Sequence, residues 1–200
     1  MNEKIKPAYI TFETGLGWLL VAQSPGGIAL VRFLGEASPS QERVMTALEG
    51  HYPGSLPLPE TESHLLKTAR ASIRRYLEKR EPIPGIALDL SKASPFDRIV
   101  WDEIQNIAFG QARSYGQIAA KTGRVGASRA VGRACGRNPV PILIPCHRVV
   151  SSGGKLGGYS GGLAIKRTLL EMEGSLAEDL LHRTGSTILK SAKSNSAIYS

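Results

Sequence analysis

An apolar stretch interrupted by a proline, residues 142–150 (ILIPCHRVV), constrains the fold of this chain more than any other segment. Apolar, β-forming residues on both sides favour burial, whereas Pro145 breaks the segment sharply. The residue after the break is Cys146, and His147 and Arg148 follow it. We therefore expect a buried segment that turns here and presents the thiol at the floor of a pocket.

Cys146 has two interpretations. Free cysteines are usually buried and pack like small hydrophobic residues, which would make this one inert. Basic, hydrogen-bonding neighbours such as His147 and Arg148 instead favour the thiolate, so we interpret Cys146 as a nucleophile. Consecutive residues of an extended chain point to opposite sides, so His147 reaches the sulfur only through a backbone turn or a bridging water.

Composition sets the outer limits. A chain of 200 residues with 42% hydrophobic residues buries a sizeable core in one large or two small domains. No window approaches the length of a membrane span, and we expect no signal peptide. The only cysteines are Cys135 and Cys146, which argues against a disulfide framework and for a reducing, cytoplasmic compartment. The four histidines show no zinc-ligand spacing.

Positive charge is concentrated in one part of the chain. The net charge is +8, and residues 104–170 contain ten basic residues and no acidic one, while the rest carries 15 basic and 17 acidic residues. Globular surfaces normally mix the two signs, so an unrelieved positive segment predicts a polyanionic partner. Nucleic acid is the first candidate.

The N-terminal half predicts an antiparallel meander followed by helices. Strands are expected at residues 9–13, 18–23 and 28–33, with a Ser-Pro-Gly-Gly turn before the third strand. Helices are expected at 40–52 and 63–79, joined by a proline-rich connector at 54–60, and one more strand is expected at 86–90. This half carries no recognisable chemistry.

The C-terminal half predicts helices. Ser94, Pro95 and Asp97 suit the N-cap, first and third positions of a helix that ends near residues 109–110. Two short helices at 115–122 and 127–137 flank a glycine-containing turn and resemble a helix-turn-helix. The second helix combines small side chains with arginines and lacks base-reading Gln or Asn, which favours non-specific DNA binding, through the minor groove.

The prolines after this helix tie it to the thiol. Residues 138–141 (NPVP) must leave the helix in extended form and run to Cys146. A glycine-rich loop at 151–162 then leads to a helix at 163–173, and the loop suits either a flexible connector or the wall of a pocket for a flat ligand. The Ser-, Thr- and Lys-rich chain from about residue 181 is expected to be disordered.

Residues 95–174 resemble the C-terminal domain of the O6-alkylguanine-DNA alkyltransferases, also called methylated-DNA–protein-cysteine methyltransferases. Several separated motifs carry the resemblance in the right order: Phe96 with Val100-Trp101, Arg113-Ser114-Tyr115-Gly116, Ser128-Arg129-Ala130-Val131-Gly132, Arg137-Asn138-Pro139, Pro145-Cys146-His147-Arg148-Val149, Tyr159-Ser160-Gly161-Gly162 and Glu173-Gly174.

The resemblance implies an α+β (α/β) fold. Its N-terminal part would be a small ribonuclease H-like domain of antiparallel strands and helices, and its C-terminal part a helical, winged helix-turn-helix domain. The corresponding boundaries are residues 1–93 for the first domain with its linker, 94–180 for the DNA-binding and alkyl-acceptor domain, and 181–200 for the tail.

The same resemblance implies catalytic roles. Cys146 corresponds to the residue that accepts the alkyl group by in-line displacement, His147 to a base that acts through water, and Glu173 to the carboxylate that orients this base. Asn138 corresponds to the residue that braces the turn. Spacing alone leaves Glu171 as an alternative to Glu173.

Further positions correspond to substrate and DNA contacts. Tyr115 and Ser160 would donate hydrogen bonds to the base, and Tyr159 and the Val149 backbone would line its pocket. Arg129 corresponds to a finger that fills the space left by a flipped nucleotide. The rest of the implied DNA-contacting surface comprises Ala127, Ser128, Gly132 and Arg133.

The implied function is direct reversal of DNA damage. A monomer would bind double-stranded DNA bearing alkylated bases through the minor groove with low sequence specificity, and transfer the alkyl group of O6-alkylguanine, with O4-alkylthymine as a second candidate, to Cys146 once. No cofactor is expected, and no zinc, because the N-terminal cysteines and histidines of zinc-binding relatives are lacking. A non-repairing sensor of alkylated bases and a cysteine hydrolase are the alternatives. Cys146 argues against the sensor, and the basic helix-turn-helix against the hydrolase.

Overall fold

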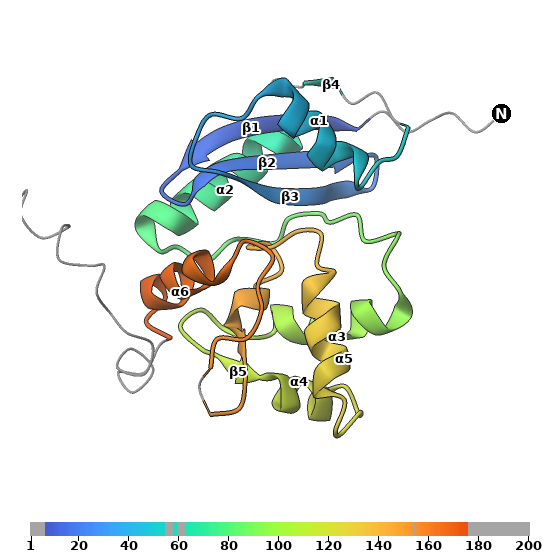
Figure 1. Ribbon diagram of the computed structural model, residues 1–200, viewed down its shortest axis with the longest axis vertical. Coiled ribbons are helices and arrows are strands. Elements are labelled where there is room, and N and C mark those ends of the chain that lie inside the picture. The colour runs from blue at the N-terminus through green and yellow to red at the C-terminus, as the bar shows by residue number, and fades with distance from the viewer. Residues whose placement is uncertain (1–6, 55–57, 60–62, 154, 176–200) are drawn as a thin grey trace, which may run out of the picture.

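The computed structural model describes residues 7–54, 58–59, 63–153 and 155–175. Figure 1 shows two halves: a sheet with a helix on each side, and below it a group of helices. The fold is mixed α/β with a small, mainly antiparallel sheet, as expected at this level of detail. The expected tail at 181–200 lies outside the described residues. None of the described helices is long and apolar enough to cross a membrane.

The sheet has the strand order β3-β2-β1-β4. The predicted meander is confirmed, because β1 (Ala8–Thr14), β2 (Gly17–Ser24) and β3 (Gly27–Gly35) pair antiparallel in sequence order. The short β4 (Leu58–Pro59) pairs parallel to β1 within the segment that we had expected to be only a connector. Two residues carry too little pattern to predict such a strand.

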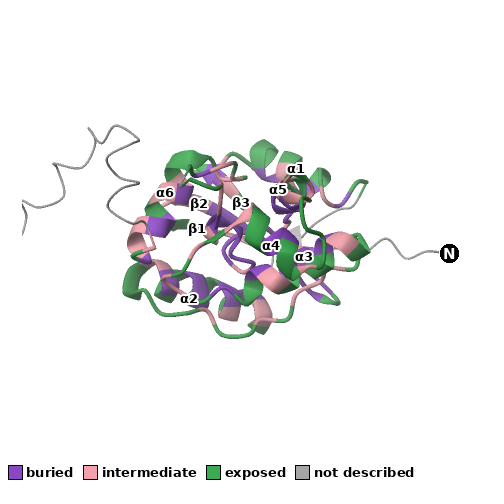
Figure 2. Ribbon diagram, turned by 90° about the horizontal axis from the view of Figure 1, so that it is seen from below, coloured by how far each residue is buried: buried purple, intermediate pink, exposed green. Residues whose placement is uncertain are grey.

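The two N-terminal helices cover opposite faces of this sheet. On β2, Leu19 and Val21 pack in one hydrophobic cluster with α2 (His64–Lys79), whereas Leu20 and Ala22 pack in another with α1 (Gln41–Glu49). Side chains alternate between the faces of a strand, so a continuous apolar run is expected where both faces are buried. Viewed from below, Figure 2 shows α2 with its buried residues directed toward the strands.

The predicted strand at residues 86–90 is wrong as a regular element. Only an isolated bridge joins Leu88 to Ile28, supported by hydrogen bonds from the Ile28 N–H to the Ala87 carbonyl (2.8 Å) and from the Asp89 N–H to the Ile28 carbonyl (2.9 Å). Pro82 and Pro84 precede this segment, and proline removes ladder donors. The segment remains extended and covers the free edge of β3.

The C-terminal half contains the expected helices in the expected order: α3 (Pro95–Gln105), α4 (Tyr115–Lys121), α5 (Ser128–Gly136) and α6 (Leu163–Met172). Ser94 caps α3 by accepting the Asp97 N–H, and Ser114 forms a capping box with Gln117 at α4. Helix α3 ends earlier than predicted, because Asn106 occupies the C-cap. Two short strands, β5 (Arg113–Ser114) and β6 (Val149–Val150), pair parallel between these helices.

The two halves share one hydrophobic core. One cluster joins strand residues such as Phe12 and Val31 to Val100, Ile144 and Cys146. The Val31 N–H also donates to the Pro139 carbonyl (2.8 Å), so the edge of the sheet supports the segment that leads to the thiol. The division into residues 1–93 and 94–180 therefore stays a proposal about folding units.

Candidate active site

The segment before Cys146 is folded around Asn138. The Asn138 amide nitrogen Nδ2 donates to the Ile144 carbonyl (2.9 Å) and to Cys146 Sγ (3.1 Å), and its Oδ1 accepts the Val140 N–H (3.0 Å). One buried side chain thus satisfies backbone groups that the prolines leave without ladder partners. Asn138 is placed to brace the turn that carries the sulfur.

The chain turns at the thiol. Residues Cys146–Arg148 form a single 3₁₀ turn in which the Arg148 N–H donates to the Pro145 carbonyl (2.9 Å). This turn removes the alternation of an extended chain, so Cys146 and His147 are both buried, with 2% and 0% of their surfaces exposed. The turn therefore buries both side chains, although no hydrogen bond joins the His147 ring directly to the sulfur among the described residues.

Behind the thiol lies a buried group that we call the relay cluster: Tyr76, His147, Arg148 and Glu173. His147 Nε2 lies 3.0 Å from Glu173 Oε1. Arg148 donates to both Glu173 oxygens, from Nη2 to Oε1 (2.8 Å) and from Nε to Oε2 (2.9 Å), and its Nη1 donates to the Ile107 carbonyl (2.6 Å). Glu173, and not Glu171, is the carboxylate that reaches His147.

Burial and hydrogen bonds together determine the protonation states of the relay cluster. Burial alone would raise the pKa of Glu173, but hydrogen bonds from His147 and Arg148 outweigh it and lower the pKa from 4.5 to about 2. Burial lowers the pKa of His147, against the opposing effect of Glu173. At neutral pH the cluster therefore holds an ionised Glu173, a charged Arg148 and a neutral His147.

One ring nitrogen of His147 is left over. Nε2 faces a carboxylate, which only accepts hydrogen bonds, so Nε2 carries the proton in the neutral ring. Nδ1 is buried and has no hydrogen-bond partner among the described residues. An unprotonated, unpartnered imidazole nitrogen one residue from a thiol is suited to take up a proton.

The thiol itself is protonated at rest. Burial raises the pKa of Cys146 to about 11, although the Asn138 hydrogen bond and the Lys166 charge act in the opposite direction. The sequence led us to expect a thiolate stabilised by His147 and Arg148. That expectation is wrong, because His147 is neutral and the charge of Arg148 is neutralised by Glu173. Reaction at Cys146 therefore needs a base.

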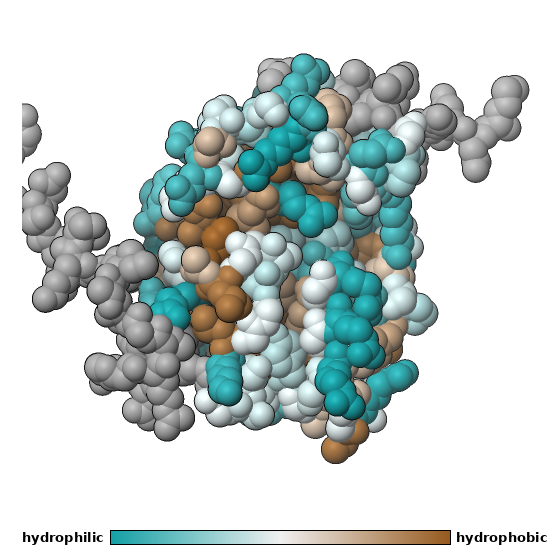
Figure 3. All heavy atoms as spheres, in the orientation of Figure 1, coloured by the Kyte–Doolittle hydropathy of each residue, from teal (hydrophilic) through white to brown (hydrophobic). Residues whose placement is uncertain are grey.

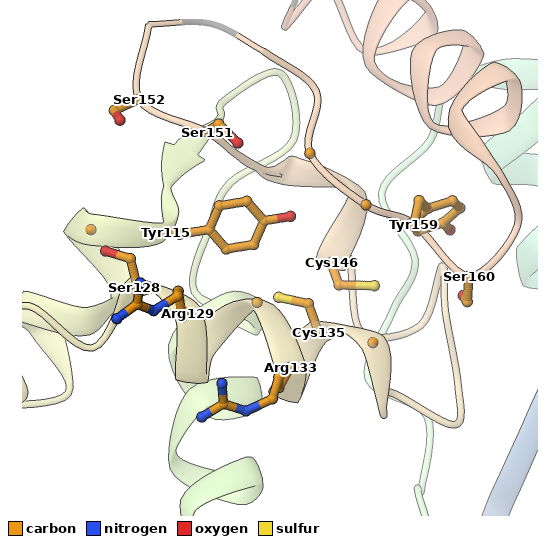
Figure 4. Close-up of a pocket in the computed structure, with 15 residues that line it drawn as sticks. Tyr115, Ser128, Arg129, Arg133, Cys135, Cys146, Ser151, Ser152, Tyr159 and Ser160 are labelled. Atoms are coloured by element: carbon orange, nitrogen blue, oxygen red, sulfur yellow. The ribbon is translucent and has the colours of Figure 1, made fainter.

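Cys146 opens into a pocket of about 820 Å³. Figure 4 shows the pocket between α5, the start of α4 and the glycine-rich loop, with the Tyr115 hydroxyl directed toward the Cys146 end and Arg129 and Arg133 on α5 at the other end. The described lining residues are Tyr115, Gly116, Ser128, Arg129, Gly132, Arg133, Cys135, Gly136, Cys146, Ser151, Ser152, Gly157, Gly158, Tyr159 and Ser160. The pocket thus joins the sulfur to a positively charged helix.

The Tyr115 ring packs directly against Gly157, where a side chain would not fit. A Cβ atom at this position would lie 2.7 Å from the Tyr115 hydroxyl oxygen, and the backbone has φ +68°. A side chain would therefore both strain the backbone and displace the ring. Burial raises the pKa of Tyr115 to about 12, so its hydroxyl stays a hydrogen-bond donor at neutral pH.

Most of the residues singled out from the sequence meet at this pocket or behind it. Tyr115, Ser128, Arg129, Gly132, Arg133, Tyr159 and Ser160 line it, and Asn138, His147 and Glu173 lie behind Cys146. Two residues do not reach the lining. Ala127 is the N-cap of α5, and Val149 is fully buried, with its carbonyl accepting a hydrogen bond from Lys166 Nζ (2.6 Å).

Sequence reasoning missed Lys166 and Tyr76. Lys166 on α6 is fully buried, and its ammonium group also donates to the Gly158 carbonyl (3.2 Å), tying the glycine-rich loop to the Cys146 turn. Burial lowers its pKa to about 8. The signal for Lys166 was its position on the apolar face of a helix. Tyr76 gave no signal beyond that of an ordinary core residue.

Not all basic residues of the positive segment 104–170 are available to contact a polyanionic partner. Arg137 pairs with buried Asp97 (2.6 Å), Arg148 pairs with Glu173, and Lys166 is buried, so these three of the ten basic residues are ion-paired or buried within the protein. Arg129 and Arg133 stay exposed. Figure 3 shows hydrophilic side chains gathered over α5 on this face. Among the described residues, no group of three or more His, Cys, Asp or Glu side chains is placed to hold a metal ion.

The family model and the similar proteins all point to the same protein family. Residues 95–175 match the family model described as the DNA-binding domain of 6-O-methylguanine DNA methyltransferase. A methylated-DNA–protein-cysteine methyltransferase of Mycolicibacterium paratuberculosis is 54% identical over 88 residues, 44% of this chain and 53% of the relative. The chain thus spans about half the length of this relative. The human protein of that name is 36% identical over 180 residues, 87% of this chain and 84% of the relative.

Solved structures extend the similarity to the whole fold. The O6-methylguanine methyltransferase of Mycobacterium tuberculosis superposes with a TM-score of 0.68 at 34% identity, covering 86% of this chain and 94% of that one. A structure of the M. tuberculosis protein in complex with DNA superposes with a TM-score of 0.68 at 33% identity, covering 88% and 99%. With the human relative matched over most of both chains, this protein belongs to the methylated-DNA–protein-cysteine methyltransferase family.

Proposed function

We propose that this protein repairs DNA by moving the alkyl group of O6-alkylguanine onto its own Cys146, with O4-alkylthymine as a second substrate. One observation carries the proposal: the Cys146 thiol lies at the floor of an open pocket beside the arginines of α5, with His147 and Glu173 behind it. Of the two cysteines that line this pocket, Cys146 is the one whose sulfur accepts a hydrogen bond from Asn138 (3.1 Å) and the one that a histidine follows in the chain.

The chemistry follows from the protonation states. His147 Nδ1 takes the thiol proton through a bridging water, and Cys146 Sγ attacks the alkyl carbon in line with the bond to O6. The S–C bond forms, the C–O6 bond breaks, and its electron pair stays on the guanine. The Tyr115 and Ser160 hydroxyls are the pocket donors that would stabilise this anion. Ionised Glu173 stabilises the imidazolium that forms at His147.

The product explains why each molecule would act once. A thioether on Cys146 has no leaving group that water can displace under mild conditions, so the acceptor is consumed. Hydrolysis by a cysteine hydrolase would instead regenerate the thiol. The transfer uses only groups of this chain, the substrate and one water molecule, and it needs no diffusible cofactor.

The proposed partner is double-stranded DNA. The target base must leave the stack to reach a buried thiol, at a cost of a few kcal/mol. In this proposal α4 and α5 form the helix-turn-helix of a winged domain, α5 enters the minor groove, and Arg129 fills the space of the flipped nucleotide. Ala127, Ser128, Gly132 and Arg133 would lie along the DNA, with low sequence specificity because α5 lacks base-reading side chains.

The remaining features of the proposal concern the whole chain. The N-terminal half would be a ribonuclease H-like domain that supports the acceptor domain. The protein would act as an intracellular, DNA-associated monomer, because one pocket and one sulfur complete the site.

The test is a mass measurement. Incubation with a duplex oligonucleotide carrying labelled O6-methylguanine should add one methyl group per molecule, located on Cys146, and then stop. Cys146→Ala should gain none and still bind the duplex, and Cys135→Ala should behave like the wild type. Repeated turnover, or no transfer at all, would reject the proposal.

A further inference from the structure

Tyr76 belongs to the relay cluster although it comes from α2, in the other half of the chain. Its hydroxyl oxygen lies 2.5 Å from Glu173 Oε1 and 3.1 Å from His147 Nε2. The side chain is 1% exposed, and the edge-on ring of Phe109 packs against it, with ring centroids 6.1 Å apart. The sequence separates Tyr76 from these partners by 71 and 97 residues.

The direction of the hydrogen bonds follows from the groups present. Glu173 is ionised and only accepts, so the single hydroxyl proton of Tyr76 is donated to Oε1. Burial raises the pKa of Tyr76, so this proton stays on the tyrosine. The hydroxyl oxygen is then free to accept, and the group facing it is the Nε2–H of His147. Nε2–H thus has two acceptors, Glu173 Oε1 and the Tyr76 oxygen.

We propose that Tyr76 is a positioning residue for His147, through which the N-terminal half takes part in the chemistry. The inference rests on the proposed alkyl transfer and deepens it. By accepting Nε2–H and donating to Glu173, the hydroxyl holds the imidazole in the tautomer whose bare Nδ1 faces away from the carboxylate. It also places a negative dipole end against Nε2–H when His147 becomes an imidazolium.

A purely structural role predicts something different. A core tyrosine needs one acceptor for its hydroxyl, and any nearby carbonyl would serve. Tyr76 instead contacts two members of the relay at once, and Glu173 already has Arg148 to neutralise it. Removal of the hydroxyl should therefore affect the base more than the fold.

The variant that tests this is Tyr76→Phe, with Tyr52→Phe as the matched control. Tyr52 is also a buried tyrosine of the N-terminal half, 5% exposed, and its hydroxyl has no hydrogen-bond partner among the described residues. Methyl transfer from O6-methylguanine duplex should be roughly 10-fold slower or more in Tyr76→Phe, as expected for a lost hydrogen bond to a charged group. In Tyr52→Phe it should stay within about twofold of the wild type.

The pH profile separates positioning from stability. With the Tyr76 oxygen gone, the imidazolium loses one acceptor and becomes harder to form, so the acid limb of the rate profile should move to lower pH by about half a unit or more. A structural defect would lower the rate at every pH and leave the limb in place. Equal rates and coincident limbs for Tyr76→Phe and the wild type would overturn the inference while leaving the wild-type transfer, and so the proposed function, intact.

A second measurement leaves Tyr76 unchanged and is made on the protein without DNA. In protein labelled with ¹⁵N-histidine, the neutral ring of His147, assigned by its loss in His147→Asn, should carry its proton on Nε2 and show a bare Nδ1. Protonation on Nδ1 would mean that Nε2 accepts from Tyr76, which contradicts the arrangement. A wild-type protein that shows the Nε2–H tautomer but transfers no methyl group would refute the function and leave the hydrogen-bond arrangement standing.

Discussion

Cys146 borders two regions that are built in opposite ways. The relay cluster is closed: Glu173 and His147 are 5% and 0% exposed, and the oxygens of Glu173 accept from Tyr76, Arg148 and His147. The pocket is open, and its walls hold glycines, serines and two exposed arginines. On one side of the sulfur, buried hydrogen bonds hold the charged groups in place. On the other side, small side chains leave room for a ligand.

The two regions meet different requirements of the proposed reaction. A base must be held in one tautomer against a counter-charge before the substrate arrives, and buried hydrogen bonds do this at no reorganisation cost during the reaction. A flat base that enters from outside needs room, which small side chains provide. Removing a charge from the relay cluster should therefore affect stability and rate together, and removing an exposed side chain from the pocket should affect mainly rate.

Glu173→Gln should have the largest effect. It leaves Arg148 buried without a counter-charge, and breaking a buried pair costs about 3 to 5 kcal/mol of unfolding free energy. Transfer should fall at least about 100-fold, because the imidazolium loses its stabilising charge. Chemical denaturation and single-turnover kinetics measure the two effects. Glu171→Gln, two residues away and outside the cluster, is the control, and equal losses in both variants would contradict the assignment.

The same carboxylate predicts a pH dependence of stability. Its pKa is lowered from 4.5 to about 2 on folding, so its contribution is present above about pH 4.5 and is lost as the pH falls toward 2. The difference in pKa corresponds to about 3 kcal/mol. Unfolding free energies of wild type and Glu173→Gln should therefore converge as the pH falls through this window. A gap that stays constant from pH 7 to about 2 would show that the Glu173 charge is not stabilising.

Arg129→Ala should have the next largest effect on rate with little effect on stability. If Arg129 replaces the flipped nucleotide in the stack, its loss should slow transfer roughly 10- to 100-fold in duplex DNA, in line with a flipping cost of a few kcal/mol. The control is Arg113→Ala, an exposed arginine that does not line the pocket, because it removes the same charge. Equal slowing in the two variants would assign the effect to charge alone.

Local patterns predicted most of the fold. The meander, the starts of four helices and the helix order follow from alternation, Ser N-caps and Pro or Gly breaks within short windows. The failures came where pairing is decided at a distance. Residues 86–90 look like a strand locally but meet β3 at a single bridge, and β4 forms because the sheet offers an edge beside it. Neither partner can be read from the segment itself.

For the site, the sequence predicted the nucleophile and its neighbouring histidine. It did not predict the distant residues that hydrogen-bond to this part of the site. Cys146 and His147 are adjacent in the chain, so their pattern is visible. Tyr76 and Lys166 act through hydrogen bonds to groups distant in the chain. Each lies on the apolar face of its helix, and that position does not reveal the partner. The charge state of Cys146 also needed the fold, because the resting pKa depends on burial and on Glu173 having neutralised Arg148.

Gly157→Ala sharpens the claim that the pocket depends on space. The added Cβ would meet Tyr115 at a backbone φ of +68°, so we expect a stability loss of about 1 to 2 kcal/mol and transfer about 10-fold slower as the ring is displaced. The neighbouring Gly158→Ala is the control, because its Cβ would meet no atom within 4 Å. It should stay within about twofold of the wild-type rate. Similar losses in both variants would point to loop flexibility as the cause.

Cys135→Ala should have the smallest effect. It tests whether Cys146 is the sole methyl acceptor of the two cysteines that line the pocket. Cys135 also lines the pocket, but burial raises its pKa to about 12, and no described histidine or asparagine side chain bonds to its sulfur. A thiol without a base beside it stays protonated and unreactive at neutral pH. We therefore expect one methyl group per molecule, a rate within about twofold of the wild type, and a stability loss of about 1 kcal/mol from the small cavity. A fall in the number of methyl groups taken up by Cys135→Ala would mean that proximity to the pocket is enough for alkylation. The closed relay cluster would then no longer explain why Cys146 is the acceptor.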